Sequence, residues 1–165
     1  MRPDDIAAEK AILDGEEILL YAKNHSLDIT ITNFKTAKSC PTILQVIHTG
    51  EEKNKTNGGI NNHWIAGVGD HIFDSLGYFR VYKIDGGGFK ELRTSPKRMQ
   101  SIGTNVCGEY VLLFLKEASL MYKTHSIEEI LKHFKAKYNI SHDTIKNDEN
   151  ILEAFRESDA SNITT

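Results

Sequence analysis

The chain has 165 residues, of which 39% are hydrophobic and 26% charged, and its formal net charge is -3. This length suits one domain that buries about two-thirds of its unfolded surface. No apolar run approaches the roughly 18 residues that a membrane span needs, so the composition predicts a soluble globular protein without a membrane partner.

The first 62 residues predict one helix and two strands. No charged region followed by an apolar stretch and a small-residue cleavage site opens the chain, so a secretory signal is not expected. A capping-box pattern at residues 14–17 predicts a helix over residues 15–23. Residues 27–34 alternate with period two and residues 42–48 are a short β-branched run, which predicts two strands. Residues 51–62 are polar and are expected to form an exposed loop.

A tight β-hairpin is predicted over residues 64–73. Two apolar segments lie there on either side of Gly69 and Asp70, a pair typical of short turns. His63 would then precede the first strand, and Asp74 would follow the second. Both side chains are therefore expected at the same end of the sheet.

Cys107 comes directly before a long apolar segment. Residues 108–122 are apolar on most faces, which predicts a helix buried in the core, with Thr104 or Asn105 as its cap. The partial positive charge at a helix N-terminus favours a thiolate. Cys40 and Cys107 are too few for a disulfide framework, which leaves room for a free catalytic thiol in an intracellular, reducing setting.

The remaining elements complete a single domain. Residues 78–84 predict a further strand, Ser126 opens a capped amphipathic helix, and residues 148–157 predict a weaker helix. We expect the domain to span residues 1–157 and residues 158–165 to be a disordered tail. The last 25 residues hold six acids and two bases, a net charge of -4, so the rest of the chain carries +1. This argues against obligate nucleic-acid binding through charge, although a local basic patch leaves nucleic acid open.

Four side chains have the types that thiol hydrolysis needs. A thiolate at Cys107 needs an imidazole to handle its proton, and the imidazole needs an acceptor on its other nitrogen; His63 and Asp74 are placed for these roles. Gln100, seven residues before the cysteine, could share stabilisation of an oxyanion with the backbone N–H of Cys107. Taken singly, three of them have plainer interpretations: a buried small hydrophobe for Cys107 and ordinary loop residues for His63 and Gln100. No metal-binding motif occurs, and no metal or cofactor is expected.

Three segments in this order resemble the adenain-like cysteine proteases, the clan of adenain and the ubiquitin-like-protein proteases. Residues 63–66 (His-Trp-Ile-Ala) are similar to the family's His-Trp-apolar strand, and residues 73–77 (Phe-Asp-Ser-Leu-Gly) to its Phe-Asp/Glu-x-Phe/Leu-Gly segment. Residues 100–108 are similar to its Gln to Cys-Gly segment. The likeness covers residues 60–116, and the seven-residue step from the glutamine to the cysteine is nearer to the viral maturation proteases.

The resemblance implies an α+β fold. One compact domain would pack a small mixed or antiparallel sheet against a buried helix that bears the nucleophile. The implied site is a triad of Cys107, His63 and Asp74, with Gln100 at the oxyanion and Trp64 in the wall of the substrate groove. The implied reaction is peptide hydrolysis through a thioester, beside small residues such as glycine.

In the viral branch the substrates are precursor capsid, core or scaffold proteins that are cleaved during virion maturation. Such a thiol endopeptidase would occur in the virion and in the cytoplasm or nucleus of the infected cell. A peptide activator is left open.

Two departures from the family keep alternatives open. The interval of eleven residues from His63 to Asp74 is shorter than is common, so Asp70 remains an alternative acid. Trp64 is the only tryptophan, whereas cellular members often close a glycine tunnel with two aromatic walls, which disfavours a ubiquitin-like substrate. An isopeptidase of the deubiquitinating or deSUMOylating type and, from another class, an inactive binding module of the same fold are the alternative functions.

Overall fold

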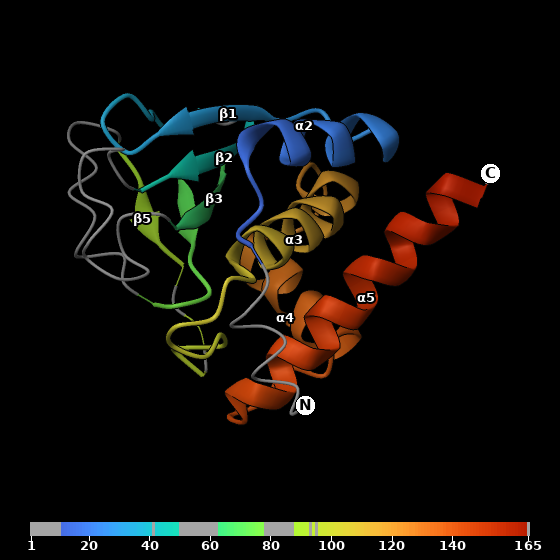
Figure 1. Cartoon of the computed structure of the whole chain (residues 1–165). Helices are drawn as coiled ribbons and strands as arrows, with labels where there is room; N and C mark the ends of the chain where they lie inside the picture. The colour runs from blue at the N-terminus through green and yellow to red at the C-terminus, as the bar shows by residue number, and fades with distance from the viewer. Residues whose placement is uncertain are drawn as a thin grey trace.

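The computed structural model describes residues 11–40, 42–49, 63–77, 88–92, 94 and 96–164. The loop expected at 51–62 and the strand expected at 78–84 lie outside these residues. The described part is an α+β arrangement of helices packed against one sheet, which confirms the predicted class (Figure 1). None of its helices combines the length and the apolar character that crossing a membrane requires.

The sheet is mixed. Its strands lie in the order β1-β2-β3-β4-β5 and comprise β1 (Thr30–Asn33), β2 (Leu44–His48), β3 (Trp64–Val68), β4 (His71–Phe73) and β5 (Lys90–Glu91). The outer pairs, β1 with β2 and β4 with β5, are parallel, and the inner pairs are antiparallel. The described helices are α2 (Gly15–Asn24), α3 (Cys107–Met121), α4 (Ile127–Lys137) and α5 (Thr144–Thr164).

Both predicted capping boxes are present. The Glu17 backbone N–H donates to Asp14 Oδ1 at 2.8 Å, and the Asp14 N–H donates to Glu17 Oε1 at 3.1 Å. Ser126 and Glu129 make the same reciprocal pair at the start of α4. Each box satisfies two backbone donors that a helix start would otherwise leave unpaired, so α2 and α4 begin where the sequence predicts.

The predicted hairpin forms with its turn at Gly69 and Asp70. Val68 pairs with His71 in the antiparallel register, and Gly69 takes a φ of +59°, a conformation that costs glycine little. The chain therefore enters β3 directly after His63 and leaves β4 directly before Asp74.

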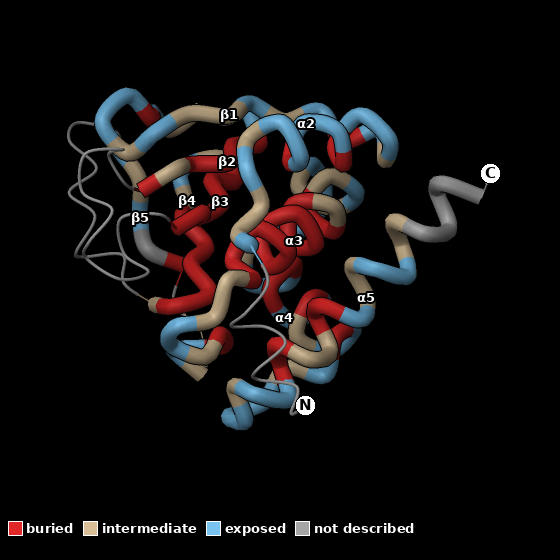
Figure 2. The backbone as a smooth tube through the Cα atoms, in the orientation of Figure 1, coloured by how far each residue is buried: buried red, intermediate tan, exposed pale blue. Residues whose placement is uncertain are grey.

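Helix α3 is buried along most of its length and forms the centre of the core. It packs against β3 and also against α4 and α5 (Figure 2). Phe114 on α3 stacks on Phe73 at the end of β4, with ring centroids 4.1 Å apart, and Phe134 on α4 meets both rings edge-on. Phe114 lies two helical turns after Cys107, so the two residues share a face of the helix. The aromatic cluster thereby fixes the nucleophile helix against the strand that leads into Asp74.

The starts of α3 and of the first strand differ from the prediction. The cap of α3 is neither Thr104 nor Asn105 but Val106, which makes no side-chain capping bond. Thr104 does not cap the helix because its hydroxyl bonds to the Ser101 carbonyl and to Asp148 instead. The first strand is shorter than residues 27–34. Leu27 is not part of it, because its N–H bonds to the carbonyl of Ala22 and closes the end of α2.

Helix α5 is longer than predicted. It begins at Thr144 and runs to Thr164, so it includes most of the segment that was expected to be a disordered tail from residue 158. Ring stacking between Phe155 and Tyr21, with centroids 4.7 Å apart, and a 3.0 Å contact between the Ser158 and Tyr21 hydroxyls join α5 to α2. These contacts extend the helix because they give its second half a partner to pack on.

Candidate active site

His63 and Asp74 form a buried pair at the end of the hairpin. The His63 carbonyl accepts hydrogen bonds from the backbone N–H and the hydroxyl of Thr49, which fixes the residue just before β3. Its Nε2 lies 2.7 Å from Asp74 Oδ1. The same carboxylate oxygen accepts the backbone N–H of Leu76 at 2.9 Å, so Asp74 is itself held in place. The structure thus joins the two residues that the sequence analysis paired.

Cys107 is the first residue of α3 and is only 2% exposed. Its thiol is close enough to His63 to act on the imidazole both by charge and by a hydrogen bond. Since Asp74 occupies Nε2, the nitrogen that remains for the thiol is Nδ1. Cysteine, histidine and aspartate therefore come together in the order that nucleophilic catalysis needs, at a helix terminus that favours negative charge on sulfur.

The electrostatics of this group favour an imidazolium. Burial acts to lower the pKa of His63, but the charge of a Cys107 thiolate and the hydrogen bonds to Asp74 and Cys107 outweigh it and raise the pKa to about 10. The neighbouring Asp74 and Cys107 side chains therefore favour the protonated ring. A thiolate beside an imidazolium is the reactive form of a thiol nucleophile.

The alternative acid, Asp70, lies elsewhere. It sits in the turn between β3 and β4, at the opposite end of β3 from His63, and its side chain is half exposed. Its Oδ1 lies 2.9 Å from His71 Nδ1 and its Oδ2 lies 3.9 Å from Lys90 Nζ. The structure joins Asp74, and not Asp70, to His63.

Gln100 is buried and its amide is held from both sides. Its Oε1 accepts the Ser75 hydroxyl at 2.6 Å, and its Nε2 donates to the Thr104 carbonyl at 3.0 Å. Its backbone N–H also donates to the carbonyl of Ser75, at 3.0 Å. Because Ser75 follows Asp74 directly, the segment of the acid also holds Gln100. From the sequence, Gln100 was a candidate and Thr104 was expected only as a helix cap. No spacing pattern marks Ser75 or Thr104 as a partner of the Gln100 amide.

Trp64 is the first residue of β3 and is buried. Its indole N–H donates to the Leu13 carbonyl at 2.8 Å. A Cβ added to Gly108 would come within 3.1 Å of the Leu13 side chain, so the absence of a side chain there lets Leu13 pack closely. Leu13 thus bridges Trp64 and the residue after Cys107, a role that the sequence analysis did not assign.

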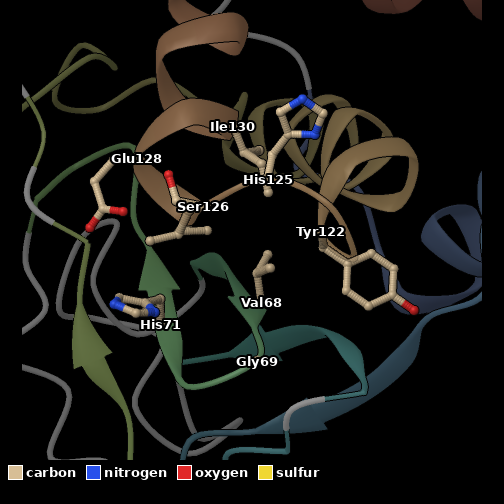
Figure 3. Close-up of a pocket in the computed structure, with 9 residues that line it drawn as sticks. Val68, Gly69, His71, Tyr122, His125, Ser126, Glu128 and Ile130 are labelled. Atoms are coloured by element: carbon tan, nitrogen blue, oxygen red, sulfur yellow. The ribbon is translucent and has the colours of Figure 1, made fainter.

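A separate pocket of about 320 Å³ lies at the other end of β3. Val68 and Ile130 contribute apolar walls, and His71, His125 and Glu128 contribute polar side chains (Figure 3). The pocket is formed by the turn after β3 and the start of α4, so it contains neither Cys107 nor its partners.

Within the described residues, His, Cys, Asp and Glu side chains do not gather in threes as a metal site would need. Comparison of the sequence and structure with protein-family models, curated proteins and solved structures gives no match.

Proposed function

We propose that this protein is a cysteine-type endopeptidase that uses Cys107, His63 and Asp74. The observation that carries the proposal is the buried imidazole of His63, which a carboxylate holds at 2.7 Å on one side and the thiol of Cys107 meets on the other. Such an arrangement places a nucleophilic sulfur beside a proton donor, and cleavage of an amide requires both.

In the proposed reaction the Cys107 thiolate attacks the scissile carbonyl carbon, and the carbonyl electron pair moves onto oxygen. The Cys107 backbone N–H and the Gln100 amide stabilise this oxyanion. The His63 imidazolium gives its proton to the leaving amine as the C–N bond breaks, which leaves a thioester. Water, deprotonated by the now neutral imidazole, then attacks the thioester and releases the acid and the thiolate. Asp74 keeps the ring oriented in both half-reactions.

The substrate class is proposed from the likeness to the viral branch of the adenain-like proteases. The substrates would be precursor capsid or core proteins, cut beside glycine or another small residue during virion maturation. The enzyme would then act in the virion and the infected cell.

Cleavage of a peptide library rich in apolar-x-Gly-x and apolar-x-Gly-Gly sequences, read by mass spectrometry, tests this function. Wild type is compared with Cys107→Ala and, as a matched control, with Cys40→Ala, which removes the chain's other thiol. We expect cuts beside glycine with wild type and Cys40→Ala and none with Cys107→Ala. Cuts that persist in Cys107→Ala would overturn the assignment. Should wild type cut no peptide, ubiquitin-like conjugates become the next substrate, and inactivity there too would favour a binding module.

A further inference from the structure

An acidic side chain of the C-terminal helix holds the loop that carries Gln100. Asp148 lies in the second turn of α5 and is 1% exposed. Its Oδ1 accepts the Tyr110 hydroxyl at 2.8 Å. Its Oδ2 accepts the backbone N–H of Ser101 at 3.2 Å and the Thr104 hydroxyl at 3.0 Å. One carboxylate thus takes three donors, two of them from residues 101–104.

The same loop is bonded on its inner side to the segment of the triad acid. Gln100 donates to Thr104 and accepts from Ser75, so hydrogen bonds run in series from Asp148 through Thr104 and Gln100 to Ser75. The residue before Asp148 adds a second contact, since Asn147 Nδ2 donates to the Met99 carbonyl at 3.1 Å. Two consecutive residues of α5 therefore form hydrogen bonds to the residues on either side of Gln100.

Asp148 also holds the helix of the nucleophile. Tyr110 lies three residues after Cys107, about one turn along α3. Its hydroxyl contacts both Asp148 and, at 3.2 Å, the Met99 carbonyl. The carboxylate is therefore shared between the loop of Gln100 and the first turn of α3, the two parts that would supply the oxyanion donors.

We infer that Asp148 is a positioning residue of the proposed protease, which sets the Gln100 amide relative to the backbone N–H of Cys107. The inference rests on the proposed function. A buried carboxylate is costly unless hydrogen-bond donors satisfy it. The three donors to Asp148 belong to the loop of Gln100 and to the first turn of α3, the two segments whose relative position the oxyanion site requires. Burial raises the pKa of Asp148 to about 6, against the effect of its hydrogen bonds, so the carboxylate form that accepts all three still prevails at pH 7.

Four variants test this role. Asp148→Asn keeps the shape but loses the charge and part of the accepting capacity. Thr104→Val removes the hydroxyl, whereas Thr104→Ser restores it. The matched control is Glu149→Gln, the same acid-to-amide change one position along α5, at a side chain that pairs with Lys146 on the surface. None of these side chains is assigned to the triad.

Three measurements separate positioning from general damage to the fold. The first is kcat and KM on a peptide that wild type cleaves. The second is the affinity of a peptide aldehyde, to which the thiolate adds to form a thiohemiacetal whose oxygen occupies the oxyanion position. The third is the rate of Cys107 alkylation by iodoacetamide, a displacement of iodide that needs no oxyanion donor.

We expect Asp148→Asn and Thr104→Val to lower kcat and aldehyde affinity about 10- to 100-fold, because a misplacement of about 1 Å has effects of this size. KM and the alkylation rate should stay near those of wild type. Thr104→Ser should recover most of the loss, and Glu149→Gln should match wild type. The inference would be overturned if Asp148→Asn kept wild-type kcat, or if it lowered the alkylation rate and the aldehyde affinity equally. Either result would leave the proposed function standing. A wild type that neither cleaves peptides nor binds the aldehyde at Cys107 would instead overturn the proposed function, and this inference with it.

Discussion

His63 has a different partner on each ring nitrogen, and this arrangement determines its charge. Asp74 takes Nε2, which leaves Nδ1 for the Cys107 thiol. A histidine that is only 1% exposed would ordinarily be neutral, since burial penalises the charged form. Here the two acidic groups reverse that preference and raise the pKa to about 10.

NMR titration of the ring of His63, with the protein labelled at histidine, tests this balance. In wild type the His63 imidazole should stay protonated from pH 6 to pH 8, because its pKa of about 10 lies above that window. In Cys107→Ala the thiolate charge and its hydrogen bond are gone, so the pKa should fall below that of wild type. Deprotonation of His63 in wild type below pH 7, or an unchanged pKa in Cys107→Ala, would contradict the proposed ion pair.

The acid partner can be tested by comparing two aspartates of the same hairpin. Asp74→Ala should lower kcat/KM by about 10²-fold or more but less than Cys107→Ala does, since the ring loses its orientation but the nucleophile remains. Asp74→Asn should lose less, because an amide oxygen can still accept the Nε2 proton. Asp70→Ala is the control and should retain wild-type activity. If Asp74→Ala impairs folding as much as activity, Asp74 has a structural role instead.

At the scale of elements, the position of Cys107 depends on an aromatic cluster that joins β4, α3 and α4. Phe73, Phe114 and Phe134 are fully buried and in ring contact, so they set the distance between the nucleophile helix and the hairpin. The apolar character of α3 could be predicted because nearly every face is hydrophobic. The contacts between the three rings could not be predicted, because residues 73, 114 and 134 are far apart in the chain.

Phe134→Ala should lower the free energy of unfolding by about 3–5 kcal/mol, since it leaves a cavity beside two rings. Leu120→Ala, at a side chain that is 77% exposed, should change it by less than about 0.5 kcal/mol. Urea denaturation followed by circular dichroism measures both. Equal effects of the two substitutions would mean that α4 does not pack on the cluster as described.

At the scale of the whole molecule, α5 connects α2 with the loop of Gln100. Phe155 and Ser158 contact Tyr21 on α2, while Asp148, near the other end of the helix, holds Ser101 and Thr104. Helix α5 therefore packs on the rest of the fold from Asp148 to Ser158.

Truncations of α5 measure how much of the helix the fold needs. Removing residues 158–165 takes away the contact between Ser158 and Tyr21, and we expect a loss of about 1 kcal/mol in unfolding free energy, typical of one hydrogen bond. Removing residues 151–165 also takes Ile151 and Leu152 out of the core, and this truncation should not fold stably. Thermal and urea unfolding of both forms give the comparison. If removing residues 158–165 lowered the free energy of unfolding by more than about 3 kcal/mol, the end of the helix would have to contribute to core packing.

By itself the sequence determined the local features: the capping boxes of α2 and α4, the turn at Gly69 and the burial of α3. These depend on residues within a few positions of one another. The sequence placed His63 and Asp74 at one end of the predicted hairpin. Only the tertiary structure decided that Asp74 and not Asp70 bonds to His63, because the bond depends on how the side chains are oriented after the hairpin has packed. It also decided that Thr104 serves Gln100 and Asp148 instead of capping α3. Asp148 and Thr104 are 44 positions apart, and only the packing of α5 beside the loop brings them together.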